Sequence, residues 1–474
     1  MSAVSSSFCR ISLIPAMLFS FAAPAFEQLS LQGRGEFYLN KQNDTAHYLA
    51  PWWQKGTGQF GHHTEAGAGP QYLVAQLETD SDFSAIVHAQ WHRAPEAGAG
   101  VTEAWLNWSP LPHEGYRIRG RAGVFYPAMS LENTDLAWTS PYTSSFSAIN
   151  SWIAEEIKTR AVELSVSRPG RFFKSDHSFQ WVGALFQGND PAGSILTWRG
   201  FALHNLQTGI GERVDFANYP SIAVGGVVEK QPAWVEPNRE LDHKTGYYTG
   251  LHWQHKDQTE VRLYWYDNRG EPTTLKDGQY AWDTRFVSLA LQHQLTEQWR
   301  LLAQYLNGDT AMGQNTVVAD YRSSYLMLNY QLEQHSLSAR YDHFEVIDKD
   351  QTPTDDNNGK GHSWTLNWTY QLTEQLNIAI EHTDLTSEQP NRTQWQGWLA
   401  EAKQRSTSLT IATLQVGALV AGIIAGAFFL IRNIRNPLRE TMAFAEQIAG
   451  GARHVARSFG ELNVVLDGFA RATA

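Results

Sequence analysis

Cysteine is almost missing from this chain of 474 residues, which contains a single one, Cys9. Cys9 stands just before an apolar run at residues 11–21, which follows one arginine and precedes Ala-Pro-Ala at residues 23–25. A charged start, a short apolar run and a small-residue end are typical of a secretory signal peptide, so we expect residues 1–25 to be removed on export. The mature chain would then hold no thiol, which excludes thiolate metal sites and cysteine nucleophiles.

Positive charge and catalytic motifs are also scarce. The formal net charge of −11 argues against nucleic acid as a partner. The chain has no G-x-S-x-G, no H-E-x-x-H and no P-loop sequence. On a strand, His88 and His92 would lie about 13 Å apart, too far to share a metal ion. We therefore predict that the protein is not an enzyme and has no catalytic residue, metal site or cofactor.

Segments in which apolar and polar residues alternate recur throughout residues 26–398. The clearest is HSWTLNWTYQL at residues 362–372, and the pattern repeats in QGRGEFYLN at residues 32–40 and EVRLYWYDNRG at residues 260–270. A period of two is typical of β-strands with one apolar and one polar face. The sequence therefore predicts an all-β domain over residues 26–398.

Two architectures would accommodate such strands, a water-soluble sandwich and a transmembrane barrel. The strands are about ten residues long, which suits a tilted crossing of a bilayer. Tryptophan and tyrosine gather toward strand ends on the apolar face, and short connections such as LTEQ alternate with long polar ones such as DKDQTPTDDNNGKG, as in outer-membrane barrels. We therefore predict a transmembrane antiparallel β-barrel of about 16 strands, a number that could reach 18 in complete relatives.

An arginine occupies every second position from 117 to 121 in GYRIRGRAGVFY, residues 115–126. In a barrel, Arg117, Arg119 and Arg121 would form a row about 13 Å long on the lumen face, because each would cost roughly 2–4 kcal/mol if it faced lipid near the bilayer midplane. The row could belong to a cross-strand charge lattice, or it could create a positive field that selects anions. The alternation assigns these residues to the lipid face: Ile118, Gly120, Ala122, Val124 and Tyr126. It predicts that the pore is also lined by Arg34, Glu36, Glu103, Arg262 and Arg340.

The longest irregular segment near this row spans residues 129–159. Membrane barrels can carry a loop inside the lumen, and such a loop would form a constriction to which Glu132, Asp135 and Trp138 belong. The alternative is an ordinary external loop. A second long insertion, residues 205–246, is predicted to be a large external loop with some strand content.

Several segments of the barrel region resemble a known group of proteins. GERVDFANYPS, WVEPNRELD, GYYTGLHW, YWYDNRGEP, DGQYAWDTRF and GHSWTLNWTYQL resemble uncharacterised proteobacterial outer-membrane porin-like proteins, in the neighbourhood of phosphate-selective-type porins. The resemblance covers residues 27–395 and is silent about substrate. It implies the outer membrane of a Gram-negative bacterium, with outer-membrane lipid, lipopolysaccharide and the barrel-assembly machinery as partners, and it is compatible with a homo-oligomer.

The expected function is a passive diffusion channel for small hydrophilic solutes with a weak preference for anions. An outer-membrane barrel hydrolase of the protease or phospholipase type is the alternative, because such enzymes are barrels too. That alternative predicts a narrow, plugged lumen and a Ser–His or Asp–His cluster at the external rim.

Residues 399–474 depart from the barrel pattern. Leu409–Ile431 carries no charge and is followed by arginines, which predicts a transmembrane helix with a cytoplasmic flank. We expect one helix over residues 405–431 and a second from Pro437 to Ala449. Residues 399–450 resemble the second transmembrane helix and linker start of a methyl-accepting chemotaxis protein.

Such a helix favours the inner membrane, so a gene fusion, a frameshift or an assembly artefact is expected near Trp398. The alternatives are a helix packed inside or beside the barrel and a membrane-anchored chemoreceptor-like fragment.

Overall fold

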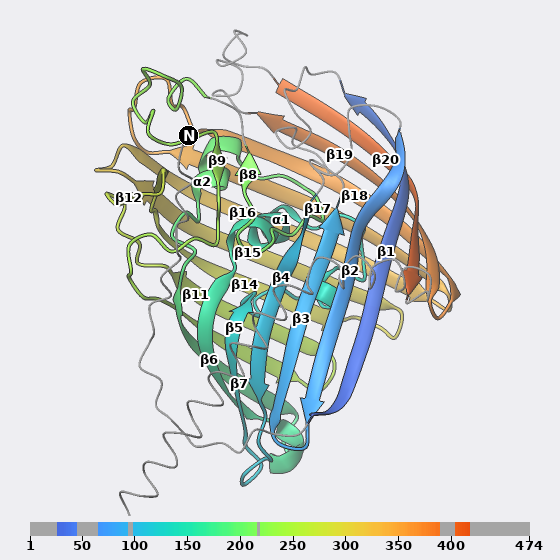
Figure 1. Cartoon of the computed structure of the whole chain (residues 1–474). Coiled ribbons are helices and arrows are strands. Elements are labelled where there is room, and N and C mark those ends of the chain that lie inside the picture. Colours follow the sequence, from blue (N-terminus) through green and yellow to red (C-terminus); the bar gives the residue numbers. More distant parts are fainter. Residues whose placement is uncertain (1–25, 45–64, 93–97, 216–218, 389–402, 418–474) are drawn as a thin grey trace, which may run out of the picture. The chain divides into compact units, whose positions relative to one another are not determined.

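The computed structural model describes residues 26–44, 65–92, 98–215, 219–388 and 403–417. Within them, sixteen strands form one closed barrel in chain order (Figure 1). Consecutive barrel strands from β1 to β19 pair antiparallel. The predicted all-β barrel of about 16 strands is confirmed.

The barrel strands are β1 (Phe26–Asp44), β2 (Glu65–Thr79), β3 (Phe83–His92), β4 (Gly98–Trp108), β5 (Arg117–Phe125), β6 (Thr159–Arg168), β7 (His177–Gln187), β10 (Gly246–His255), β11 (Thr259–Asp267), β14 (Asp283–Gln294), β15 (Trp299–Met312), β16 (Val317–Leu332), β17 (His335–Asp348), β18 (Gly359–Thr373), β19 (Leu376–Glu388) and β20 (Lys403–Gly417). Two short strand pairs are β8 (Val214–Asp215) with β9 (Trp234–Val235), and β12 (Leu275–Lys276) with β13 (Gln279–Tyr280). The helices are α1 (Ala148–Glu156), α2 (Ser194–Arg199) and the 3-10 turns η2 (Leu136–Trp138) and η3 (Gly170–Phe173).

Side chains alternate between the two faces of the barrel wall as the period of two predicts. On β18, Trp364 and Leu366 are 55% and 52% exposed, whereas Thr365 and Asn367 are buried. The exposed apolar side chains of the wall include Leu29, Leu31, Phe37, Leu106, Ile118, Val162, Leu164, Leu251, Leu263, Trp265, Leu289, Tyr305, Leu326, Leu337, Trp364 and Leu366. The apolar residues therefore form an outer belt instead of a core between two sheets.

The two ends of the barrel differ in the length of their connections. At one end, the short-turn end, β2 joins β3 through residues 80–82, β16 joins β17 through residues 333–334, and β18 joins β19 through residues 374–375. At the other end, the long-loop end, the connections include residues 126–158 and 188–245. In outer-membrane barrels the short turns are periplasmic and the long loops extracellular.

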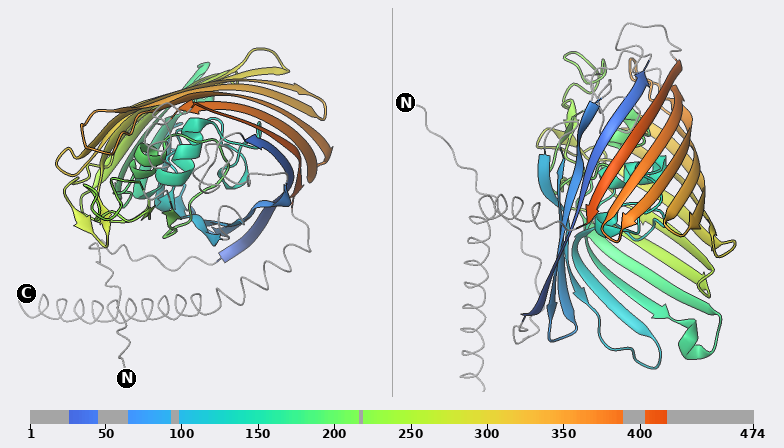
Figure 2. Two further views of the ribbon diagram at one scale, coloured as in Figure 1. Left: turned by 90° about the horizontal axis from the view of Figure 1, so that it is seen from above. Right: turned by 90° about the vertical axis from the view of Figure 1, so that its right-hand side faces the viewer.

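The segment of residues 126–158, here called the first internal segment, lies inside the barrel (Figures 1 and 2). All nine residues of its helix α1 are buried, and α1 contacts β15, β16 and β17. Trp152 packs edge-on against the rings of Phe286 and Tyr321, with centroid distances of 5.4 Å and 5.1 Å. Apolar packing against the inner wall therefore holds α1 in place.

The second long insertion, residues 205–246, differs from its predicted place outside the barrel at its start, whereas Val224 and Val227 farther along are exposed. Helix α2, which precedes it, is entirely buried, and Asn205, Leu206, Gln207 and Thr208 are buried as well. Gln90 of β3 donates a hydrogen bond to the backbone carbonyl of Gln207. Residues 189–208, here called the second internal segment, thus pack against the inner wall because polar side chains of the strands satisfy their backbone groups.

The C-terminal part of the barrel corrects a further prediction. Residues 403–417 form strand β20, which completes the closed barrel, so the helix expected from residue 405 is wrong over residues 405–417, and the barrel extends past residue 398. A strand satisfies the backbone edges of β1 and β19, which a helix would leave unpaired. Residues 1–25, 418–431 and 437–449, with their predicted signal peptide and helices, lie outside the described residues. None of the described helices has the length and apolar composition needed to cross a membrane.

Candidate functional site

The arginine row on β5 is divided by its ion pairs. Arg121 binds Glu163 of β6 through two contacts, from Nε to Oε1 at 2.6 Å and from Nη2 to Oε2 at 2.9 Å. Glu163 also accepts a hydrogen bond from the Tyr248 hydroxyl at 2.5 Å, and the Arg121 guanidinium lies 3.8 Å from the centre of the Phe125 ring. Arg121 therefore belongs to a cross-strand charge lattice.

Arg117 and Arg119 lie on the same face of β5 but differ in their surroundings. Their cross-strand neighbours on β6 are Ser167 and Ser165. Among the described residues, neither arginine forms an ion pair, and Arg117 contacts the Phe172 ring at 5.8 Å. The charges of Arg117 and Arg119 can therefore attract anions from solution.

Tyr126, which the alternation assigns to lipid, is instead buried. Strand β5 ends at Phe125, so Tyr126 begins the first internal segment. Its ring stacks on Trp138 at 4.4 Å, and its hydroxyl donates to the carbonyl of Ala154 at 2.9 Å. The period of two stops predicting orientation where the strand ends.

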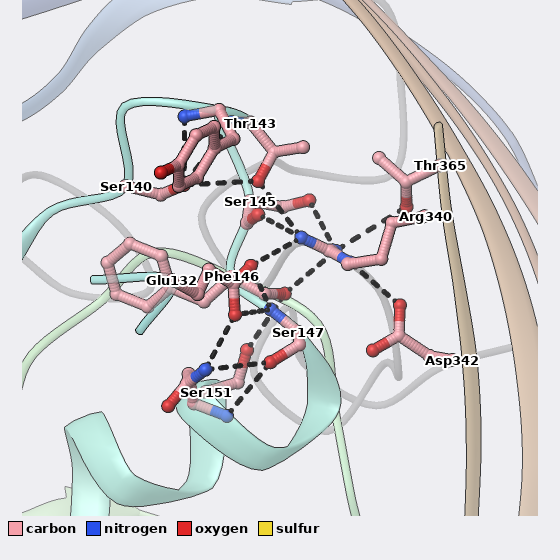
Figure 3. Close-up of polar contacts among 12 residues, drawn as sticks. Glu132, Ser140, Thr143, Ser145, Phe146, Ser147, Ser151, Arg340, Asp342 and Thr365 are labelled. Carbon is pink, nitrogen blue, oxygen red and sulfur yellow. Dashed lines mark hydrogen bonds and ion pairs between the residues drawn. The ribbon is translucent and has the colours of Figure 1, made fainter. Parts of the chain in front are cut away.

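Arg340 of β17 fastens the first internal segment to the wall (Figure 3). Its Nη1 lies 2.8 Å from Oε1 of Glu132 and donates to the Ser145 carbonyl at 2.7 Å. Its Nη2 donates to the carbonyl of Phe146 at 3.0 Å, and its Nε binds Asp342 at 2.8 Å. Because Arg340 is fully buried, it acts as an anchor and offers no free charge to a pore.

The carboxylates around Arg340 also bind the backbone of the first internal segment. Glu132 accepts from the Ser147 N–H at 3.0 Å and from Nδ2 of Asn150 at 2.6 Å, which fixes the start of α1. Asp342 accepts from the Ala148 N–H at 3.0 Å. Glu381 of β19 accepts from the Ser144 N–H at 2.7 Å. Each carboxylate is therefore occupied by N–H donors of the internal segment.

Arg34 and Glu36 of β1 hold both internal segments. Arg34 donates to Oδ2 of Asp135 and to Oγ1 of Thr139, each at 2.8 Å, and its Nη2 lies 3.2 Å from Glu36. Glu36 accepts from Nδ2 of Asn205 in the second internal segment at 3.0 Å. Both residues face the interior, but their charges are paired.

Arg262 and Glu103 contact the beginning of the first internal segment. Arg262 of β11 donates to the carbonyls of Ala128 at 3.1 Å and Ser130 at 2.7 Å. Glu103 of β4 accepts from the Tyr126 N–H at 3.0 Å and lies 2.8 Å from Nδ1 of His88. The eight residues predicted to line a pore all face the interior, and of these Arg117 and Arg119 have no charged partner among the described residues.

The contact between α1 and α2 is a feature that the sequence reasoning missed. Glu155 binds Arg199 of α2 at 2.8 Å and lies 3.0 Å from Nε2 of His204. Glu156 accepts from the Ile195 N–H at 2.9 Å and from Nε1 of Trp152 at 2.6 Å. Burial raises the pKa of Glu156 to about 7. Burial would also raise the pKa of Glu155, but the neighbouring Arg199 and His204 outweigh it and lower that pKa.

The sequence signal for this contact is the pair Glu155–Glu156 within the otherwise apolar stretch SWIAEEI. Two adjacent carboxylates in a buried helix need partners from elsewhere in the chain.

Three carboxylates meet in the connection between β7 and β10. Oxygens of Asp190, Glu240 and Asp242 lie within 4.8 Å of one another, a grouping that no metal motif in the sequence indicates. Asp190 accepts from the Leu241 N–H, and burial raises its pKa to about 7. Hydrogen bonds from the loop's own backbone account for this cluster.

A cavity of about 180 Å³ remains beside the first internal segment, near the short-turn end. Its walls come from β16 to β19 and the β16–β17 turn on one side and from residues 140–144 on the other.

Of protein families, curated proteins and solved structures, only solved structures match the chain. No protein-family model matches the chain, and no curated protein matches it either. An anion-selective porin from Comamonas acidovorans is 12% identical, with 82% of this chain and 99% of that chain covered and a TM-score of 0.46. OmpT of Vibrio cholerae is 8% identical, with 82% and 97% covered and a TM-score of 0.43. The outer-membrane channel DcaP of Acinetobacter baumannii is 8% identical, with 81% and 96% covered and a TM-score of 0.44.

Proposed function

We propose that this chain is an outer-membrane diffusion channel for small hydrophilic solutes with a weak preference for anions. The observation that carries the proposal is a closed barrel with an apolar outer belt, on whose inner wall Arg117 and Arg119 have no ion-pair partner among the described residues. A closed barrel with such a belt satisfies all backbone groups within a bilayer.

The anion preference comes from the unpaired part of the arginine row. Arg117 and Arg119 raise the local concentration of anions near the short-turn end. Arg121 adds little, because Glu163 neutralises it. Salt shortens the reach of the field to about 8 Å near physiological ionic strength, so the preference is weak. Glu132, Asp135 and Trp138 belong to the segment that narrows the passage.

The wider setting follows from the same proposal. The barrel lies in the outer membrane of a Gram-negative bacterium, among lipid and lipopolysaccharide, after insertion by the barrel-assembly machinery. A homo-oligomer would form through the outer belt.

Reversal potentials of the full-length chain in planar bilayers under a KCl gradient test the proposal. The double variant Arg117→Ser/Arg119→Ser should lose most of the anion preference, whereas Arg322→Ser, which removes an exposed charge paired with Glu345, should keep it. Absence of conductance from a folded, inserted barrel contradicts the channel. An unchanged reversal potential in the double variant contradicts the role of the two arginines.

The two internal segments, which narrow the barrel interior, favour one second candidate, a barrel hydrolase. His204 and Glu155 form a histidine–carboxylate pair there, but both are fully buried. The neighbouring Ser151 hydroxyl donates to the backbone carbonyl of His204 at 3.2 Å. Hydrolysis of a peptide or phospholipid substrate that is lost in Ser151→Ala would favour this candidate.

A further inference from the structure

The cavity beside the first internal segment has an unusual lining. On the wall side it is lined by Gln331, Gln334, Ser336, Thr369, Gln371 and Asn377, and hydroxyls of residues 140–144 face them. Amides and hydroxyls thus dominate both sides. Apart from Asp135, the lining of this cavity is uncharged, in contrast to strand β5, which carries Arg117, Arg119 and Arg121.

The carboxylate of the cavity lining and the charged groups that bind the segment beside it are already occupied. Asp135, the one carboxylate of the lining, binds Arg34 at 2.8 Å. Glu381, close by on β19, accepts N–H groups of Ser144 and Ser145. Arg340 is fully buried among its own partners. A solute in the cavity therefore meets dipoles instead of free charges.

Several of these side chains keep hydrogen-bonding capacity. The Thr369 and Ser336 hydroxyls accept bonds from Asn367 and Asn329, so each still has a proton to donate. Gln334 uses its carbonyl oxygen for the Tyr370 hydroxyl, which leaves its NH2 group. Gln371, which is exposed, offers both a donor and an acceptor from one amide. The cavity thus presents donors and acceptors side by side.

We infer that this cavity binds a small uncharged polyhydroxylated solute, such as a monosaccharide or a sugar alcohol, on its way through the channel. The inference rests on the proposed function, which it deepens by naming a solute class. A polyol hydroxyl both donates and accepts, which matches the mixed lining. An anion could use the donors alone and would face the amide oxygens, and a cation finds no free carboxylate in the lining. The volume corresponds to about six water molecules at roughly 30 Å³ each, the scale of one small solute.

The test measures binding separately from conduction. The full-length chain, refolded in detergent, is titrated by saturation-transfer NMR with D-glucose and D-sorbitol as neutral probes and with gluconate as an anion of similar skeleton. The variant Thr369→Val/Gln371→Leu removes two polar groups of the lining. Gln254→Leu removes a glutamine of β10, which lies outside the lining, and serves as the matched control.

Glucose and sorbitol should bind saturably and more tightly than gluconate. The double variant should weaken glucose binding about fivefold or more, since it loses neutral hydrogen bonds, while Gln254→Leu leaves binding unchanged. No saturable glucose binding, tighter binding of gluconate, or equal affinity in the double variant overturns the inference. Conductance of the same preparation separates the two proposals: a conducting barrel without glucose binding defeats the site alone, and glucose binding by a non-conducting barrel defeats the channel alone.

Discussion

Two inward-facing arginines of this barrel, Arg340 and Arg119, show how surroundings decide the role of a residue type. Arg340 is fully buried between Glu132 and Asp342. These ion pairs neutralise its charge and hold the first internal segment against the wall. Arg119 is exposed and faces a serine across the strand pair, so its charge acts on solution. Removing one partner of a buried pair leaves an uncompensated charge, which costs far more than removing an exposed one.

Arg340→Met should lower the free energy of unfolding by about 3–5 kcal/mol, because Glu132 and Asp342 would stay buried without their cation. Arg322→Met, on the neighbouring strand β16, breaks the exposed pair with Glu345 and should cost at most about 1 kcal/mol. Urea unfolding of the two variants in the same detergent gives the comparison. Equal losses would show that Arg340 does not anchor the segment.

The outer belt yields a second prediction for single residues. Leu366→Arg places a charge on the lipid-facing side of β18 and should cost roughly 2–4 kcal/mol if the site lies near the midplane. Leu111→Arg, in the connection between β4 and β5, changes a residue that is 87% exposed and should cost little. Unfolding from lipid vesicles measures both. A similar small effect at both positions would contradict the assignment of the belt to lipid.

Helices α1 and α2 contact each other directly through side chains, in addition to packing against the barrel wall. Glu156 caps the backbone at the start of α2 and is fully buried. Burial raises its pKa to about 7, above the value of 4.5 of an unshifted glutamate, so the docked state holds a proton that the undocked state releases. Docking is therefore strongest below about pH 4.5 and weakens as pH rises through about 7.

Hydrogen exchange of residues 194–199, corrected for the intrinsic rate, should show this dependence. Protection should fall by up to about tenfold per pH unit between about pH 5 and pH 6.5 and level off above pH 7, and Glu156→Gln should remove the fall because it cannot ionise. A peptide from β16 serves as the internal reference. Protection in the native chain that stays flat or rises with pH would contradict a Glu156 that docks in its protonated form.

At the scale of the whole barrel, closure depends on a strand from a region whose composition favours a helix. β20 follows β19 in the ring, and β1 is its other neighbour. Without β20, two strand edges would expose unpaired N–H and C=O groups to hydrocarbon, at several kcal/mol for each group.

Truncation tests this requirement. A chain that ends at residue 417 keeps β20 and should still migrate on gels as a compact, heat-modifiable barrel. A chain that ends at residue 402 lacks β20 and should lose that behaviour, because its edges cannot pair. Compact migration of the shorter chain would show that β20 is dispensable for closure.

The sequence alone determined the faces of the strands, because a period of two is a local property that each segment carries by itself. It also determined the barrel class and the inward direction of the arginine row, since both follow from the cost of placing polar groups in lipid. Tertiary structure decided which arginines keep a free charge, because Glu163, Glu132 and Asp342 reach their partners from other strands or from the internal segments.

It also decided that both internal segments lie against the inner wall, and that the uncharged run after residue 405 begins as a strand. Both outcomes depend on contacts between residues far apart in the chain. Composition and periodicity describe a segment's own preference, whereas closure of a barrel and filling of its interior depend on the partners that the rest of the chain supplies.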